Sequence, residues 1–324
     1  MRVVSLLPSA TEHLCFLGAA GALAGRSHEC DFPPEALAAP VLTAARIPAG
    51  ASPGQTDAMV REELAAGRSL YTLDEALLER LEPDLIITQD LCNVCSIDLA
   101  AVRRVAAGMK RPPEVLSLNP QTMEDVLEDL LNVGQAVGLA SEAKKAVVGL
   151  RERMYRASDY VNPYLDGPNV AFLEWTDPLF AGGHWTPQLI ERAGGRHPLN
   201  PTTAKEGSGA AVGPQQTARR AGKSMRVAPE VLAASRPDRL IICPCGVALP
   251  GVREMARDLA AAPWWADLPA VGRSGGAGVA LVDGNQMFNR PGPRLVDAFE
   301  WLVGWLNNRP ELIPDGFPWE PWGG

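Results

Sequence analysis

The stretch VVSLLPSATE, residues Val3–Glu12, decides the fold class. A short apolar run that ends at Pro8 predicts a buried strand. The polar residues that follow predict the start of a helix, because Ser9 and Glu12 have the spacing of a capping box. Short apolar runs alternate with helix-like stretches along the rest of the chain. This alternation is typical of βαβ units, so we expect an α/β fold built on mostly parallel sheets.

The length and a partial internal similarity predict two lobes. The chain has 324 residues, whereas a typical domain has roughly 100–200. The segments Leu81–Ile87 and Ala234–Ile242 both read as a helix end, then Pro-Asp, then a buried strand. A helix from about Ser141 to Tyr160 would span roughly 30 Å, which is long enough to connect two lobes. We expect an N-terminal lobe over 1–139, a connecting helix over 140–161 and a C-terminal lobe over 162–324.

Charge and hydropathy exclude several classes of partner. The net charge of -8 disfavours nucleic acid and anionic membrane surfaces, both of which attract clustered Lys and Arg. No run of about 18 or more apolar residues is present, so we expect no membrane insertion. The first strand starts at Val3 with no secretory signal ahead of it. This predicts a cytoplasmic protein, or a periplasmic one if the sequence has been trimmed.

The residues with chemical potential gather in segments that directly follow predicted strands. In open parallel sheets, ligands bind beyond the carboxyl ends of the strands. Seven segments have this position: Pro8–Glu12, His28–Asp31, Gln89–Cys95, Glu174–Pro178, Gly182–Trp185, Cys243–Gly246 and Asp283–Phe288. We expect the two lobes to bring these loops into one cleft.

A large planar ligand is one interpretation of these loops. Trp175, Trp185 and Phe288 would offer flat apolar faces, and His184 would contact the ligand or bind its metal. The alternative is that the three rings are ordinary packing residues and that His184 is a polar loop residue hydrogen-bonded to the backbone. The predicted ligand-binding residues are Ser9, Gln89, Asp90, Trp175, His184, Trp185, Met287 and Phe288.

A metal site built from cysteines is a second interpretation. Cys92 and Cys95 have the spacing of half a zinc or iron–sulfur site, or of a redox dithiol. The alternative is that these thiols are simply packed along the cleft. The candidate metal ligands are His28, Cys30, Cys92, Cys95, Cys243 and Cys245. A thiol-dependent enzyme is a third interpretation, although no base is visibly paired with a nucleophile and no hydrolase, P-loop or dinucleotide motif is present.

Several of these blocks together resemble the cobalamin-binding type of ABC-transporter solute receptors. The similar blocks are Val3–Glu12, Gly25–Pro33, Pro83–Ile87, Gly183–Trp185, Gly194-Gly195, Pro244–Gly246 and Arg290–Asp297. The wider superfamily also binds ferric siderophores, heme and bare metal ions. The resemblance implies two lobes of central sheets flanked by helices, a rigid connecting helix, and a corrinoid or similar metal chelate in the cleft.

The sequence differs from the exported receptors in three features. It lacks an export signal, it contains the cysteine-rich loop Gln89–Cys95, and it has an extra stretch, Asn200–Lys223, that we expect to be a long irregular loop. An ABC permease is therefore an alternative partner rather than the expected one. A small-molecule ligand that is stored, sensed, handed over or chemically processed is the expected partner.

Overall fold

The computed structural model describes the whole chain except residues 49, 91–96, 209–212, 214–217, 273–276 and 324. It separates into two compact units. Unit 1 consists of Met1–Pro120 with Asp125–Gly149, and unit 2 consists of Gln121–Glu124 with Leu150–Gly324. The limits expected at 139/140 and 161/162, and the connecting role of the helix between them, stay predictions. None of the helices in the described part of the chain is long and apolar enough to cross a lipid bilayer.

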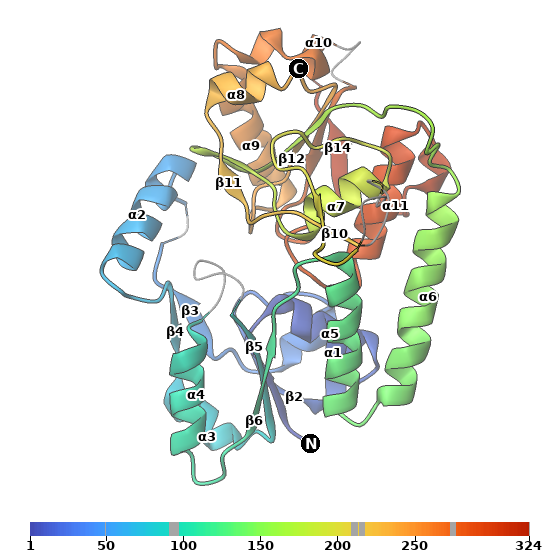
Figure 1. Cartoon of the computed structure of the whole chain (residues 1–324). Coiled ribbons are helices and arrows are strands. Elements are labelled where there is room, and N and C mark those ends of the chain that lie inside the picture. The colour runs from blue at the N-terminus through green and yellow to red at the C-terminus, as the bar shows by residue number, and fades with distance from the viewer. Residues whose placement is uncertain (49, 91–96, 209–212, 214–217, 273–276, 324) are drawn as a thin grey trace. The chain divides into compact units, whose positions relative to one another are not determined.

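Unit 1 is built on a four-stranded parallel sheet in the order β2-β1-β5-β6 (Figure 1). Its strands are β1 (Val3–Ser5), β2 (Leu23–Arg26), β5 (Leu85–Gln89) and β6 (Glu114–Leu118). The central strands β1 and β5 are buried along their whole length, as strands covered on both faces must be. A separate antiparallel pair joins β3 (Thr43–Ala45) to β4 (Tyr71–Leu73).

Helices cover the sheet of unit 1. They are α1 (Pro8–Phe16), α3 (Glu75–Leu81), α4 (Leu99–Gly108) and most of α5 (Met123–Ala136), and the first half of α6 (Ala140–Ser158) also belongs to this unit. The unit contains one more helix, α2 (Pro53–Ala65), which has no buried residue. Leu78 of α3 and Val102 of α4 share one hydrophobic cluster with strand residues Val4 and Ile86. These apolar contacts fix both helices against the sheet.

The start of α1 differs from the prediction. The helix begins at Pro8, its N-cap is Leu7, and no side chain caps it. Ser9 therefore lies inside the first turn, and the capping box expected between Ser9 and Glu12 is wrong. Proline suits the first helical position because its fixed φ matches the helix and it has no N–H left to satisfy, so the N-cap lies at Leu7, two residues before the predicted Ser9.

Unit 2 is built on a six-stranded sheet in the order β11-β8-β7-β12-β13-β14. The strands are β7 (Val170–Thr176), β8 (Leu179–Ala181), β11 (Met225–Arg226), β12 (Arg239–Ile242), β13 (Val279–Val282) and β14 (Trp319–Pro321). The central strands β7, β12 and β13 run parallel, whereas β8, β11 and β14 add antiparallel edges. The predicted α/β class with central sheets and flanking helices is confirmed, and this second sheet is mixed.

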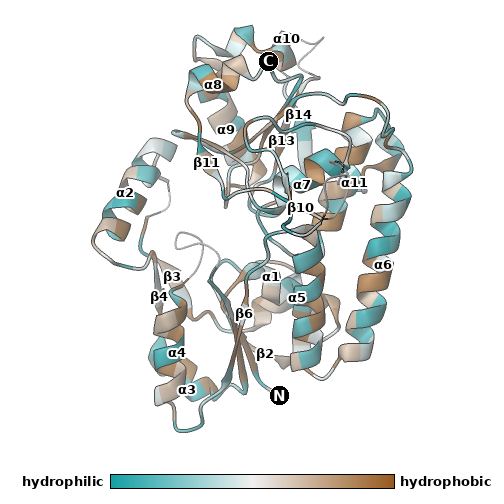
Figure 2. Cartoon of the chain, in the orientation of Figure 1, coloured by the Kyte–Doolittle hydropathy of each residue, from teal (hydrophilic) through white to brown (hydrophobic). Residues whose placement is uncertain are grey.

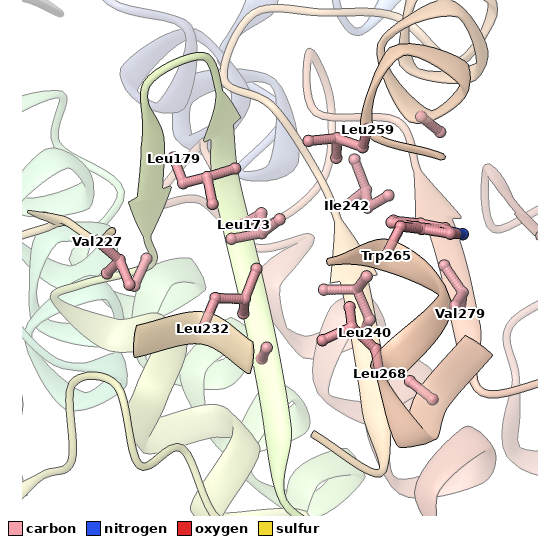
Figure 3. Packing of buried hydrophobic residues seen from close by; sticks show 14 of the residues in the cluster. Leu173, Leu179, Val227, Leu232, Leu240, Ile242, Leu259, Trp265, Leu268 and Val279 are labelled. Atoms are coloured by element: carbon pink, nitrogen blue, oxygen red, sulfur yellow. The ribbon is translucent and has the colours of Figure 1, made fainter. Parts of the chain in front are cut away.

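One face of this sheet carries a compact hydrophobic cluster (Figure 3). Leu173, Leu240 and Ile242 from the central strands pack there with Leu232 of helix α8 (Pro229–Ala234) and with Trp265. Because successive strand residues point to opposite faces, Phe172 belongs to the other face, where its ring contacts Phe288. The helices of unit 2 are α7 (Trp185–Arg192), α8 (Pro229–Ala234), α9 (Leu249–Ala260), α10 (Pro269–Gly272) and α11 (Leu295–Leu306).

The helices differ in how their apolar residues are distributed. Figure 2 shows α11 as largely hydrophobic, whereas α5 and α6 carry both hydrophobic and hydrophilic residues. Trp301 of α11 is fully buried and its ring stacks on Trp305 and on Phe317. A helix that is apolar on most sides is a buried helix, so α11 forms part of the interior of unit 2.

The stretch Asn200–Lys223, expected to be irregular throughout, contains a short hairpin. Its strands are β9 (Thr203–Ala204) and β10 (Arg219–Arg220), which pair antiparallel. The prediction failed for these residues because two-residue strands show no alternation of apolar and polar side chains. Tertiary contacts hold the hairpin instead, since the backbone carbonyl of Arg219 accepts a hydrogen bond from Gln188 of α7 at 3.2 Å.

Candidate functional site

The turn between β8 and α7 places His184 in a strained conformation. Its backbone has φ 55° and ψ -120°, and it is the N-cap residue of α7. Only glycine adopts such angles without cost. The preceding Gly183 lies against the backbone of residues 222–224, where an added Cβ would lie 2.2 Å from the nitrogen of Ser224. The turn is thus fixed by backbone packing, with a histidine side chain at its tip.

The imidazole of His184 has defined neighbours within unit 2. Its Nδ1 lies 3.1 Å from Oε1 of Gln121, and its ring stacks on Trp185 with centroids 5.7 Å apart. Burial, and then the charge of Lys223, lower the pKa of His184 below its ordinary value. The ring is therefore neutral at neutral pH. A neutral imidazole is the form that binds metals.

Behind this turn, a second strained residue accepts a hydrogen bond from Trp185. Phe288 has φ 60°, and its carbonyl accepts from Nε1 of Trp185 at 2.7 Å. Trp185, Phe288 and Met287 are all buried. They therefore support the loops from the interior, whereas their predicted ligand contact stays a prediction.

The loops after β12 and β13 are joined by hydrogen bonds. Asn289 Nδ2 donates to the carbonyls of Cys243 and Gly284, at 3.1 and 2.8 Å. Asp283 accepts from the backbone N–H groups of residues 285 and 286 at 3.1 and 3.0 Å. At the end of β7, half-buried Trp175 donates from Nε1 to the carbonyl of residue 177 at 3.0 Å. The carboxyl edge of this sheet is thus a set of well-held loops.

The described cysteines do not form a metal centre. Cys15, Cys30, Cys243 and Cys245 are free thiols, and no group of three or more His, Cys, Asp or Glu in the described ranges is placed to hold a metal ion. Cys30 is buried in unit 1. Cys243 is buried in unit 2, where its thiol donates to the carbonyl of Met287 at 3.6 Å.

The thiol chemistry of Cys243 is also unfavourable for catalysis. Burial raises the pKa of Cys243 well above the ordinary value of a thiol, and the thiolate is the reactive and metal-binding form. Cys245 is exposed. Cys92 and Cys95 lie outside the described residues. The described cysteines therefore give no support to a zinc or iron–sulfur site, or to catalysis by Cys243.

Unit 1 carries a second polar cluster at the carboxyl end of β2. His28 Nδ1 lies 2.7 Å from Oγ1 of Thr43, and its ring faces Tyr71 with centroids 5.5 Å apart. The hydroxyl of Tyr71 donates to Oε1 of Glu29 at 3.3 Å. Sequence analysis identified His28 but missed Tyr71, because a tyrosine in a three-residue strand has no distinguishing pattern.

The remaining predicted residues of unit 1 occupy two environments. Ser9 and Gln89 are buried, in α1 and at the end of β5. Asp90 is exposed, and its backbone N–H donates to Oδ1 of Asn119 at 2.6 Å. The parallel strands β1, β2 and β5 place these residues and His28 at the same edge of the sheet.

The whole chain is similar to several solved receptors, although its sequence has diverged. It is 21% identical to the periplasmic heme-binding protein RhuT from Roseiflexus sp. RS-1, over 95% of this chain and 98% of that one, with a TM-score of 0.65. It is 18% identical to the periplasmic vitamin B12-binding protein BtuF of Vibrio cholerae, over 96% and 98%, with a TM-score of 0.62. It is 16% identical to an ABC transporter substrate-binding protein from Listeria monocytogenes EGD-e, over 95% of this chain and 98% of that one, with a TM-score of 0.66.

The chain has the fold of ABC-transporter solute-binding proteins. This confirms, at the level of the fold, the resemblance found in the sequence. Neither the models of protein families nor the curated proteins include one that matches this chain. Fold alone does not dictate the ligand, so the ligand has to be argued from the loops.

Proposed function

We propose that this protein is a receptor for a metal chelate of the corrin or porphyrin class, with a cobalamin-like corrinoid as the first candidate. The observation that carries the proposal is His184, a neutral and oriented imidazole on a strained turn. Non-glycine residues in such conformations cluster at functional sites. An imidazole there suits a ligand whose metal has an open axial position.

Two further observations support the class of ligand. Solved proteins of the same fold are named for binding heme and vitamin B12. The turn that carries His184 is backed by the large rings of Trp185 and Phe288, which keep it rigid. Rigid sites favour rigid ligands because less conformational freedom is lost on binding.

The cluster in unit 1 offers a second group of the required chemistry. Thr43 Oγ1 accepts from the backbone N–H of His28 at 3.0 Å and donates to Ser27 at 3.1 Å. Nδ1 of His28 lies 2.7 Å from that same hydroxyl, and this contact fixes the orientation of the ring. Tyr71 lies beside it as an oxygen donor suited to ferric iron.

A visible titration tests the proposal. Untagged, metal-free protein is titrated separately with aquocobalamin, cyanocobalamin, cobinamide and hemin. We expect a saturable spectral shift at a 1:1 ratio with at least one of them. Flat titrations with all four at micromolar protein would overturn it.

Matched variants locate the contact. His184→Ala is expected to abolish the shift of the bound metal band, and His28→Gln serves as the comparison in unit 1. Loss with His28→Gln and not with His184→Ala would assign the axial group to the unit 1 cluster. An unchanged spectrum in both variants would remove histidine ligation from the proposal.

Location decides which role such a receptor plays. A receptor outside the cytoplasmic membrane can deliver its ligand to an ABC permease, whereas a cytoplasmic one can store it or hand it to an enzyme. The cytoplasmic location expected from the sequence is kept as a proposal. Fractionation of cells that express the full gene from its own start, followed by immunodetection, tests it, and detection in the periplasmic fraction would overturn it.

A further inference from the structure

We infer that Gln121 is a positioning residue that holds the imidazole of His184 in the tautomer with the proton on Nδ1, so that Nε2 presents its lone pair. The presentation of that lone pair to a chelated metal rests on the proposed function. The choice of tautomer does not, because it is a property of the protein alone.

The hydrogen bond itself gives the direction of the effect. His184 Nδ1 and Gln121 Oε1 are 3.1 Å apart. An amide oxygen only accepts, so Nδ1 must be the donor and must carry the proton of the neutral ring. The free imidazole side chain in water favours the other tautomer, with its proton on Nε2. Gln121 therefore reverses the intrinsic preference of the ring.

The residues that directly follow Gln121 are held against α7, the helix that His184 caps. The residues Gln121–Glu124 belong to unit 2, although the chain on both sides of them belongs to unit 1. Gln188 of α7 accepts from the backbone N–H of Met123 at 2.9 Å, and its Nε2 donates to Glu124 at 3.1 Å. Arg192, one turn further along α7, donates to Glu124 at 2.9 Å.

The other side of His184 is fixed as well. Its backbone N–H donates to the carbonyl of Gly222 at 2.9 Å. Asn200 Nδ2 donates to the carbonyls of Gly182 and Lys223 at 3.1 and 3.0 Å. These two hydrogen bonds connect the turn to the segment that lies against it. The imidazole thus has a fixed backbone, a stacked neighbour and an oriented acceptor. A side chain that binds a metal in one fixed direction requires such restraints, and this ring has three independent ones.

This arrangement has the form of an outer-shell interaction. Metal-binding histidines donate their second ring N–H to an acceptor that fixes tautomer and orientation, and loss of that acceptor typically weakens metal binding by about 10–100-fold. Gln121 supplies such an acceptor without adding a charge. The neutral acceptor is consistent with the lowered pKa of His184, because a carboxylate in its place would favour the protonated ring.

Nuclear magnetic resonance on the full chain with ¹⁵N-labelled histidine tests the tautomer. The chain has four histidines, and the loss of one signal set in His184→Gly assigns His184. At pH 8, two-bond ¹H–¹⁵N correlations are expected to show protonated Nδ1 in the native protein. Gln121→Met is expected to shift the signal toward protonated Nε2, whereas Gln121→Glu retains protonated Nδ1.

The matched control is Gln135→Met, which changes an exposed glutamine of α5. It is expected to leave all four signal sets unchanged, so that any change in Gln121→Met reports the local contact. A native His184 with protonated Nε2, or a tautomer that is the same in Gln121→Met, would overturn the inference.

Titration of the same variants with aquocobalamin separates this inference from the proposed function. Gln121→Met is expected to bind about 10–100-fold more weakly. Gln121→Glu is expected to bind near the native level, with the midpoint of its pH profile moved upward by the higher His184 pKa. No binding by the native protein despite the expected tautomer removes the proposed function alone. Unchanged binding in Gln121→Met despite an altered tautomer removes the part played by Gln121 in ligand binding.

Discussion

Replacement of His184 by alanine and by glycine separates the strain energy of its backbone from the contribution of its imidazole to ligand binding. At φ 55° and ψ -120°, a residue with a Cβ is strained by about 1–3 kcal/mol. Alanine keeps that strain, and glycine relieves it. Both variants lose the hydrogen bond to Gln121, which contributes about 1 kcal/mol, and the stacking on Trp185.

The two variants are therefore expected to rank in an unusual order. In an ordinary position glycine is less stable than alanine by about 0.5–1 kcal/mol, because the unfolded chain is more flexible. At position 184 the relief of strain exceeds this, so the glycine variant is expected to be more stable by about 1–2 kcal/mol. For a unit of this size that is a difference in Tm of about 2–8 °C.

Differential scanning calorimetry and a chelate titration, run on the same samples, measure both consequences. The glycine variant is expected to have the higher Tm, and both variants are expected to lose the spectral shift equally. An alanine variant more stable than the glycine variant by the ordinary difference of about 0.5–1 kcal/mol would show that the turn is not strained. Native affinity in either variant would show that the imidazole does not contact the ligand.

Three further predictions concern buried ionisable groups. Burial, with Asp125 nearby, raises the pKa of Asp129 from 3.8 to about 7, so stability declines as the pH rises from about 4 to 7. Asp129→Asn is expected to raise the free energy of unfolding by at most about 4 kcal/mol at pH 8 and to leave it unchanged at pH 4. Calorimetry at the two pH values measures this as a Tm that rises only at pH 8, and an equal effect at both would contradict the prediction. Burial lowers the pKa of His197, so the unfolded chain binds the proton more readily than the folded one. The free energy of unfolding is therefore expected to fall below about pH 6.5, by up to about 1.4 kcal/mol per pH unit. His197→Gln is expected to flatten the curve of Tm against pH, and an unchanged curve would contradict this. Buried Glu191 pairs with Arg219 and accepts hydrogen bonds from the backbone N–H and the hydroxyl of Thr202. Glu191→Ala is expected to lower the free energy of unfolding by about 3–5 kcal/mol, because it leaves the charge of Arg219 without this partner. Calorimetry of the native protein, Glu191→Ala, Arg219→Met and the double variant is expected to show that the double variant recovers part of the loss.

The buried strands were predictable because their signal is local. The run of apolar residues after Pro83 predicted a strand within a residue or two of β5, Leu85–Gln89. The edge strand β14 was not foreseen, since a three-residue segment is decided by the partner strand it pairs with. Helix α2 was also missed, although Ser52 and Gln55 form a complete capping box. None of its residues is buried, so no apolar stripe marked it.

The candidate site was predictable in position and not in its contacts. His184 could be placed from the sequence because it follows a strand and precedes a helix. Its partner Gln121 lies 63 residues away along the chain, and Tyr71 lies 42 residues from its partner Glu29. Such pairs depend on how distant segments fold together, and a single sequence contains no local pattern for them.

Two of the residues of unit 2 with positive φ lie on loops that one hydrogen bond joins. His184 and Phe288 both have positive φ, and the ring of Trp185, directly after His184, donates to the carbonyl of Phe288. Strain at two positions persists only where the surroundings fix the backbone, and here buried rings, glycine contacts and hydrogen bonds do so. A flexible lid would not need such restraints. The arrangement fits a preformed surface for a rigid ligand, in which the energy that holds the turn is supplied by the fold before the ligand arrives.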